Sequence, residues 1–448
     1  LAEPDPVPVE VGELDLADAP GAQAERRHHG RSCREGAVGG GISSSSPRHC
    51  SASCNGSASS TTRGRSHTDT PLTLPSAPMA NPEKIEQLRA RARREIDEDG
   101  LPSCQFALAL DGEVIHHEAF GDATTDSRYV MFSATKAVVA SAVWLLIQSG
   151  DLDVSKTVAD YIPEFGANGK EHVTVEQVML HTSGFPAAPL GAPAWSSREA
   201  RLQRFAEWKL NFEPGTKFIY HPTSAHWVLA ELIDRLSGVD YREFIKAQVL
   251  SPLGLADRLQ LGVPVDEQGD ITTLEKRGEP VSPDELEKLL GIRSLPVTEV
   301  TDDALIGFND PETRALGVPG GGGVSDAASM ALFYQGLLHN PAGIWKDDAL
   351  LDFTGNVRNH LPDVISQLPI ERTLGLCTAG FDGKGSMRGF GKTVSGRTFG
   401  HAGAAGQIAW ADPESGISFC YLTNGVEANF LKVARRGTAL SSIAGECA

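Results

Sequence analysis

The sequence lacks the signatures of several common protein classes. It has seven cysteines among 448 residues, an odd number, and none of them forms a Cys-x-x-Cys pair. This usage is typical of reduced thiols and favours a cytoplasmic location. The HExxH pattern of metalloproteases and the Gly-x-Ser-x-Gly pattern of α/β-hydrolases are both missing. We therefore expect no metal site, no cofactor and no α/β-hydrolase nucleophile elbow.

Long hydrophobic runs and an excess of positive charge are also missing. No stretch reaches about 20 apolar residues, the length that a membrane span requires. The longest apolar run, Ala137–Ile147, is interrupted by Ser141 and predicts a buried helix. No early apolar segment resembles a signal peptide. The net charge of −18 argues against nucleic acid or an anionic membrane as the main partner.

The first 78 residues differ in composition from the rest of the chain. They contain runs of glycine, serine and threonine with scattered arginine and histidine, and little apolar periodicity. Such a segment buries too little surface to offset its ordering entropy, so we interpret 1–78 as disordered or as sequence upstream of a start at Met79. Asn81 and Pro82 then predict the beginning of a helix.

The remaining residues, 79–448, predict one hydrolase domain of the α+β class. Asp111-Gly112 lies between two alternating segments and predicts a hairpin, and Asp412–Gly416 predicts a second one near the end of the chain. Residues from about 136 to 310 are largely helical in pattern. After the glycines at 320–323 we expect a helix that Ser325 caps. We therefore expect one antiparallel sheet, formed by about 83–135 and 310–448, flanked by helices and interrupted by a mostly helical inserted region.

Ser133 and Lys136 are the first candidates for chemistry. Residues three apart on a helix share a face, so a helix that starts at Ser133 would bring its hydroxyl to the Lys136 amine. The N-terminal N–H groups of that helix would favour an oxyanion. A lysine acts as a base only when neutral, which requires its pKa to fall from about 10.4 to near 7, roughly 4–5 kcal/mol. The alternative is a capping serine beside a solvated lysine.

Five further segments follow in an order that resembles the SxxK serine hydrolases, from about residue 83 to the end of the chain. This family includes class C β-lactamases, DD-peptidases and family VIII carboxylesterases. The segments are Val178–Pro186 (VMLHTSGFP), Pro214–Tyr220 (PGTKFIY), Ser251–Leu255 (SPLGL), Gly320–Ser325 (GGGGVS) and Phe399–Gly403 (FGHAG). The resemblance implies the β-lactamase/transpeptidase-like fold.

The resemblance also implies roles for single residues. Tyr220 corresponds to the family's catalytic tyrosine, and a nearby ammonium would favour its phenolate. His221-Pro222 replaces the x-Asn that follows this tyrosine, so His221 is a candidate substitute donor to substrate. His401 and Gly403 belong to the third motif and are further candidates for substrate binding. Structural roles remain the alternative for Tyr220, His221 and His401.

Two departures from the family pattern favour an ester as substrate. His401-Ala402-Gly403 replaces the family's Lys-Thr-Gly, which removes the fixed cation and the hydroxyl that hold a carboxylate. Pro222 replaces the Asn that faces an acylamide side chain in the family's β-lactamases, and it has no side-chain amide or N–H to bind one. By resemblance, the backbone N–H groups of Ser133 and Ala404 would form the oxyanion hole. We therefore expect hydrolysis of a small-molecule carboxylic ester through a Ser133 acyl-enzyme. The alternatives are a DD-peptidase or weak β-lactamase, a transacylase, and a non-catalytic binding protein of the same fold.

Overall fold

The computed structural model describes residues 80–448, except for 189, 192–193, 295–298 and 365. The interpretation of 1–78 as a disordered or additional segment, and of Met79 as a start, concerns residues that lie outside this range. The helix that we expected after them begins at Pro82. Asn81 caps it by accepting a hydrogen bond from the Lys84 N–H at 3.3 Å.

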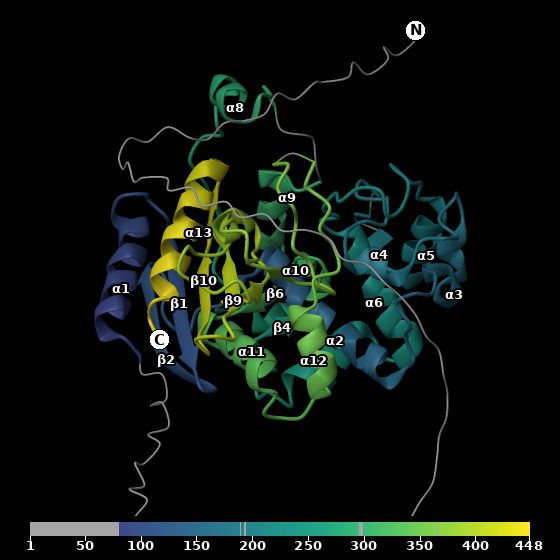
Figure 1. The fold of residues 1–448 in the computed structure, drawn as a ribbon, viewed down its shortest axis with the longest axis horizontal. Coiled ribbons are helices and arrows are strands. Elements are labelled where there is room, and N and C mark those ends of the chain that lie inside the picture. The colour runs from purple at the N-terminus through teal and green to yellow at the C-terminus, as the bar shows by residue number, and fades with distance from the viewer. Residues whose placement is uncertain (1–79, 189, 192–193, 295–298, 365) are drawn as a thin grey trace, which may run out of the picture. The chain divides into compact units, whose positions relative to one another are not determined.

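A six-stranded antiparallel sheet forms the centre of the described part (Figure 1). Its strand order is β2-β1-β10-β9-β8-β7, so strands from both ends of the chain pair with one another. The strands are β1 (Ser103–Leu110), β2 (Glu113–Gly121), β7 (Cys377–Thr378), β8 (Phe399–Gly400), β9 (Ile408–Ala411) and β10 (Ser418–Thr423). The expected α+β fold with one antiparallel sheet is confirmed.

Both predicted hairpins are present. Asp111 and Gly112 turn the chain between β1 and β2 with φ angles of 54° and 83°. Positive φ at both turn positions matches the twist of the flanking strands, which explains the Asp-Gly pair. In the second hairpin, Asp412–Gly416 joins β9 and β10.

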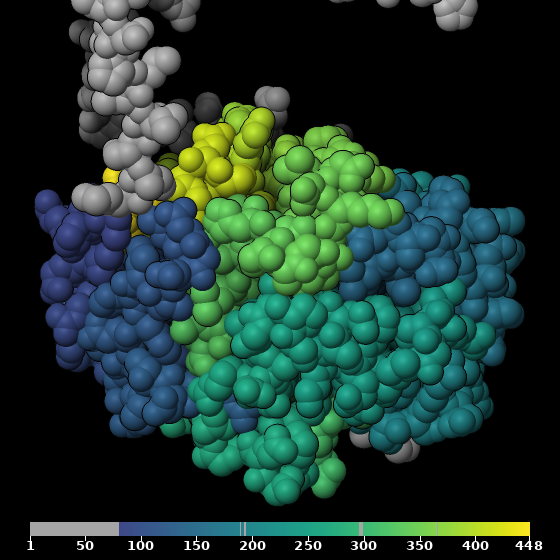
Figure 2. All heavy atoms as spheres, turned by 90° about the horizontal axis from the view of Figure 1, so that it is seen from below, coloured from purple at the N-terminus to yellow at the C-terminus, as the bar shows by residue number. Residues whose placement is uncertain are grey.

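Helices cover both faces of this sheet. On one face, α1 (Pro82–Asp97) and α13 (Phe430–Ala444) lie side by side, joined by the hydrogen bond from the Asn81 N–H to the Cys447 carbonyl at 2.8 Å. In Figure 2 the purple and yellow segments, which begin and end the described part, lie toward the same side of it. On the other face lies α11 (Ala327–His339). All of β1 is consequently buried.

Helix α2 (Thr135–Ser149) lies in the interior and follows a 3₁₀ turn over Phe132–Ala134. Contrary to our expectation, one segment has the length and hydropathy of a membrane span, namely Phe132–Ser149 with a mean hydropathy of 1.3. However, 72% of this segment is buried inside the fold. The prediction of a buried core helix is therefore confirmed.

The inserted region is helical, as expected, and appears in blue and teal in Figure 1. Its helix α6 packs directly against α2, which joins this region to the rest of the fold. The helices are α3 (Val158–Tyr161), α4 (Val175–Met179), α5 (Arg198–Glu207), α6 (Ser224–Ser237) and α7 (Tyr241–Ile245).

Shorter elements complete the described part. A three-stranded sheet has the order β3-β6-β4, and β5 pairs with β11 in parallel. These strands are β3 (Tyr129–Val130), β4 (Gln260–Leu261), β5 (Glu275–Arg277), β6 (Gly323–Ser325) and β11 (Gly425–Glu427). The remaining helices are α8 (Pro283–Leu290), α9 (Asp302–Ile306), α10 (Pro311–Leu316) and α12 (Asp347–Gly355).

The residue that caps α11 lies one position later than the sequence predicted. Ser325 does not cap this helix, because it is the last residue of β6 and pairs with Tyr129. Asp326 is the cap and accepts a hydrogen bond from the Ser329 N–H at 2.7 Å.

Candidate active site

Ser133 lies in the 3₁₀ turn that leads into α2. The preceding residue, Phe132, has a φ angle of 45°, which is strained for a side chain of this size. The turn is held by β3, which pairs with β6, and by Thr135, whose hydroxyl accepts a hydrogen bond from the Gly323 N–H at 2.9 Å. Strain of this kind persists only where the surroundings fix the backbone.

Lys136 is completely buried and meets Ser133, as the three-residue spacing predicted. Its Nζ lies 3.1 Å from Ser133 Oγ, 2.7 Å from the Pro222 carbonyl oxygen and 2.5 Å from the Gly320 carbonyl oxygen. Burial lowers the pKa of Lys136 well below its usual value, and Arg372 lowers it further. A neutral amine has two N–H groups for the two carbonyls, which leaves its lone pair for the Ser133 hydroxyl.

The glycine run before β6 allows this close approach. A side chain at Gly320 would place its Cβ 2.8 Å from the Pro222 carbonyl oxygen and 3.5 Å from Lys136 Nζ. A Cβ at Gly323 would lie 2.7 Å from the Thr135 hydroxyl. The glycines therefore let the backbone itself contact the nucleophile turn.

Tyr220 lies between Lys136 and the cavity, with its ring centre 5.1 Å from Lys136 Nζ. Its hydroxyl oxygen is buried and has no hydrogen-bond partner among the described residues. Burial raises the pKa of Tyr220 to about 12, against smaller opposing effects of Ser133 and Arg372. The expected phenolate is therefore wrong: a neutral Lys136 provides no ammonium, so desolvation dominates and the phenol keeps its proton.

His221 points into the interior and not toward the cavity. Its Nδ1 lies 2.6 Å from the Ile219 carbonyl oxygen, and its Nε2 accepts a hydrogen bond from the Phe185 N–H at 3.1 Å. Burial lowers its pKa to about 3. The structure thus does not bring this candidate to substrate, and its two ring nitrogens serve to hold the loop that carries Tyr220.

His181 packs against the loop that carries Tyr220 and His221. Its ring stacks on Tyr220 at a centroid distance of 4.7 Å, and its Nδ1 accepts the His221 N–H at 3.0 Å. Gly184 follows with a φ of 91°, as expected for a turn after a helix. From the sequence we interpreted Val178–Pro186 only as a motif shared with the family. Its residues do not indicate that His181 packs against Tyr220, which lies 39 residues later in the chain.

His401 follows β8 and lines the cavity, whereas Gly403 does not. Burial lowers the pKa of His401 well below its usual value, so the ring is neutral. Its Nδ1 donates to the Ala402 carbonyl oxygen at 2.8 Å. A Cβ at Gly403 would lie 2.3 Å from the Met131 carbonyl oxygen, so this glycine lets the third motif approach the nucleophile turn.

The two expected oxyanion donors face one cavity. Ser133 and Ala404 both line it, and neither backbone N–H donates to an acceptor within the described residues. Ala405, directly after Ala404, has a φ of 61° and mirrors the strain at Phe132. Two free N–H groups held by rigid backbone suit a developing negative charge on oxygen.

The cavity has a volume of about 880 Å³, in the range of small-molecule sites. Ser133, Tyr220 and His401 lie on its wall together with a mainly apolar set of side chains. These include Pro186, Ile219, Val364, Phe390, Ile408 and Trp410. The only arginine among the described lining residues, Arg388, is paired with Asp382 at 2.5 Å.

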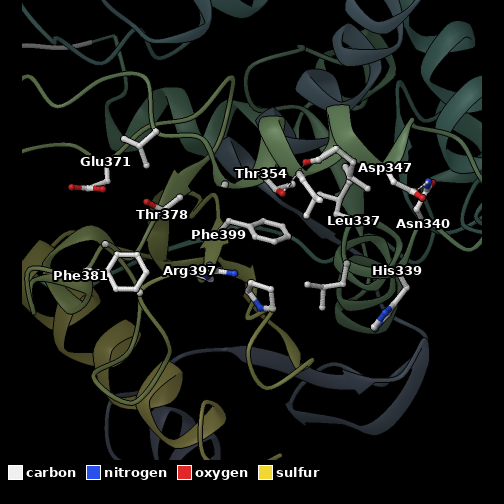
Figure 3. Close-up of a pocket in the computed structure, with 18 residues that line it drawn as sticks. Leu337, His339, Asn340, Asp347, Thr354, Glu371, Thr378, Phe381, Arg397 and Phe399 are labelled. Carbon is white, nitrogen blue, oxygen red and sulfur yellow. Dashed lines mark hydrogen bonds between the residues drawn. The ribbon is translucent and has the colours of Figure 1, made fainter. Parts of the chain in front are cut away.

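A second cavity of about 660 Å³ lies on the opposite face of the β7–β8 edge (Figure 3). Neighbouring residues alternate between the two: Cys377 and Gly400 line the first cavity, Thr378 and Phe399 the second. Its described lining includes no serine or lysine. The chemistry therefore belongs to the first cavity.

Sequence reasoning missed three residues around Lys136. Arg372 and His226 are buried beside it, and Glu299 lies at the rim, where its carboxylate accepts hydrogen bonds from Thr223 at 2.7 and 3.0 Å. None of them belongs to a recognisable motif, and their approach to Lys136 depends on the tertiary fold alone.

The geometry of a serine, a buried lysine and a tyrosine around one cavity defines a serine hydrolase of the β-lactamase/transpeptidase-like fold. The sequence model of the Beta-lactamase family matches residues 85–441 of this chain. The chain therefore belongs to the Beta-lactamase family.

The chain is similar to curated and solved proteins with different activities. It is 28% identical over 329 residues to Esterase/beta-lactamase LipL of Mycobacterium tuberculosis, covering 67% of this chain and 70% of that protein. A family VIII carboxylesterase structure shares 23% identity with a TM-score of 0.67, covering 83% of this chain and 99% of that one. A penicillin-binding protein homologue from Caulobacter crescentus shares 24% identity with a TM-score of 0.65, covering 82% and 99%.

Proposed function

We propose that the protein is a carboxylesterase that hydrolyses neutral esters through an acyl-enzyme on Ser133. In the first step, the Ser133 hydroxyl gives its proton to the Lys136 lone pair, and Oγ bonds to the ester carbonyl carbon. The carbonyl oxygen becomes an oxyanion, which the N–H groups of Ser133 and Ala404 hold. Each fixed donor at such a developing charge typically raises the rate by about 10²–10³-fold.

Collapse of this intermediate breaks the bond to the alcohol. Tyr220, a neutral phenol beside the nucleophile, donates its proton to the departing alkoxide and recovers one from the Lys136 ammonium. Water then attacks the acyl group, and its proton returns through the same pair of residues. The products are the carboxylic acid, the alcohol and the free enzyme.

The absence of a free cation on the wall of the catalytic cavity, among the described residues, carries the choice of an ester. His401 is neutral, Ala402 has no hydroxyl, and Arg388 is already paired with Asp382. The carboxylate of Glu299 also lines the cavity and would repel an anion. A neutral substrate with apolar groups therefore fits better than a β-lactam or a peptide with a free carboxylate. The esterase in the name of the relative LipL supports the same choice.

The experiment compares two chromogenic substrates on the full chain. We expect turnover of p-nitrophenyl butyrate with a kcat/KM at least about 10²-fold above that of nitrocefin, a cephalosporin that carries a carboxylate. The Ser133→Ala variant serves as the control and should lose both activities. Preferred hydrolysis of the cephalosporin would contradict the assignment to esters, and full activity of Ser133→Ala would contradict the nucleophile.

A further inference from the structure

Arg372 is a buried cation without a counter-ion among the described residues. Its side chain is 2% exposed. Within the same part of the chain, Nε and Nη1 have no hydrogen-bond partner, and Nη2 lies 3.5 Å from His401 Nε2. Leaving a charge unpaired in the interior is strongly unfavourable. A feature with such a cost calls for a functional reason.

The position of Arg372 connects it with the catalytic lysine. Its guanidinium carbon lies 5.9 Å from the centre of the Tyr220 ring, and Lys136 Nζ lies 5.1 Å from the same centre. Arg372 does not line the cavity, whereas its two neighbours His401 and Tyr220 do. It is therefore placed to act on the catalytic residues and not on substrate directly.

The neighbouring carboxylate does not neutralise Arg372. Glu371 precedes it in the chain but lines the second cavity, on the other side of the sheet edge (Figure 3). There it lies 3.7 Å from His360. Successive side chains of an extended backbone point to opposite sides, so the Glu371 carboxylate and the Arg372 guanidinium are separated.

We propose that Arg372 is a positioning residue of the esterase reaction: a permanent buried cation that keeps Lys136 as the free amine and fixes the ring of His401. The proposal rests on the assignment of Lys136 as the proton acceptor. Arginine side chains stay charged across the pH range of enzymes, so their field does not vary with pH. A like charge nearby makes protonation of Lys136 unfavourable.

The other groups around Lys136 cannot supply this field. His226 faces it from α6, His181 from the turn after α4, and His401 from the segment after β8; burial lowers the pKa of each imidazole well below its usual value. Tyr220 keeps its proton. Glu299, at the exposed rim, acts in the opposite direction and favours the ammonium. Arg372 is thus the one permanent positive charge among the described groups that face Lys136.

The test measures the pH dependence of Ser133 labelling by a fluorophosphonate, a probe that needs no substrate specificity. In Arg372→Gln, we expect the acidic limb of the labelling rate to move by about one pH unit or more toward higher pH. Arg397→Gln is the matched control, because this arginine is 70% exposed and its loss changes the net charge equally. In the control the limb should not move.

A second measurement does not depend on activity or on one variant. The ε-carbon of Lys136 is followed by NMR in protein labelled with [ε-¹³C]lysine, with Lys136→Arg for assignment, in the wild type, Arg372→Gln and Arg372→Lys. We expect the Lys136 titration to move to higher pH in Arg372→Gln and to move less in Arg372→Lys, which retains a cation. If folded Arg372→Gln shifts neither the Lys136 titration nor the acidic limb of the labelling rate, the proposal is wrong.

Two further results separate this inference from the proposed function. If the wild type is not labelled at Ser133, the proposed function fails, and the inference that rests on it fails with it. If labelling is normal but Arg372→Gln raises only KM for nitrocefin, without a shift of the limb, Arg372 binds the substrate carboxylate and our proposal is wrong.

Discussion

Lys136 Nζ lies 3.1 Å from Ser133 Oγ, and both of its remaining hydrogen-bonding directions end at backbone carbonyls, those of Pro222 and Gly320. These carbonyls come from two segments that are 98 residues apart in sequence. No described carboxylate pairs with the amine, and burial together with Arg372 lowers its pKa, which favours the neutral lysine. The chemistry that we propose follows from this arrangement.

Replacement of Lys136 by methionine should lower kcat/KM for p-nitrophenyl butyrate by about 10²–10⁴-fold, because Ser133 loses its base. Lys170→Met is the matched control. Lys170 is also buried and donates to the carbonyls of Ala167 and Trp208, but it lies outside the catalytic cavity. The control should lose stability and keep its kcat/KM. Equal losses of activity in both variants would contradict the role of Lys136.

The Tyr220→Phe variant should separate catalysis from stability. Its hydroxyl makes no hydrogen bond with the described residues, so its removal should leave the free energy of unfolding within about 1 kcal/mol of the wild type. With an alkyl ester such as ethyl butyrate as substrate, we expect kcat to fall by about 10²-fold or more, because the leaving alkoxide loses its proton donor. The comparison is Tyr241→Phe, whose hydroxyl donates to the Gly317 carbonyl at 2.8 Å. It should lose stability and retain kcat.

The pH dependence of acylation should show one acidic limb, that of Lys136, and no limb from a histidine. Lys136 must lose its proton to act, and its lowered pKa means that activity rises with pH at values below its usual 10.5. The histidines around it have lowered pKa values and are already neutral, while Tyr220 keeps its proton up to about pH 12. A stopped-flow profile of kcat/KM from pH 5 upward measures this. If the profile is bell-shaped and has a limb near pH 6.5 that disappears in His401→Asn, His401 is the base instead.

Alanine at Gly320 should impair the lysine without removing it. The added Cβ would lie 2.8 Å from the Pro222 carbonyl oxygen, so one of the two lysine acceptors must move. We expect kcat to fall by about 10-fold or more with a smaller change in KM. Gly307→Ala is the control, because nothing lies within 4 Å of its Cβ position. Wild-type kcat in Gly320→Ala would show that the close approach is not required.

The buried pair of Glu95 and Arg436 should dominate the stability of the contact between α1 and α13. Its atoms are 2.5 Å apart, and the two side chains are 1% and 2% exposed. Glu95→Ala leaves a buried arginine without its partner and should cost about 3–5 kcal/mol of unfolding free energy. Glu98→Ala removes the exposed pair with Arg94 and should cost at most about 1 kcal/mol. Urea unfolding of both variants tests the difference.

Local patterns in the sequence predicted those parts of the fold that depend on neighbouring residues. The Asp111-Gly112 turn, the Asn81 cap and the meeting of Ser133 with Lys136 each follow from spacing and from the chemistry of two or three side chains. The shift of the α11 cap to Asp326 was missed because Ser325 is used by a strand pairing that is not local.

The electrostatics of the site could not be predicted in the same way. The protonation of Tyr220 depends on whether Lys136 is charged, which depends in turn on burial and on Arg372, 236 residues further along the chain. His221 was a candidate for substrate binding because of its place in a motif. Its orientation is set instead by Phe185 and Ile219, whose backbone groups are invisible in a sequence pattern.

Intact-protein and peptide mass spectrometry after reaction with a fluorophosphonate tests the central claim most directly. The account predicts one phosphonate adduct per chain, on the peptide that contains Ser133, formed in the wild type and lost in Ser133→Ala. A single adduct at another residue, or an adduct that persists unchanged in Ser133→Ala, would contradict it.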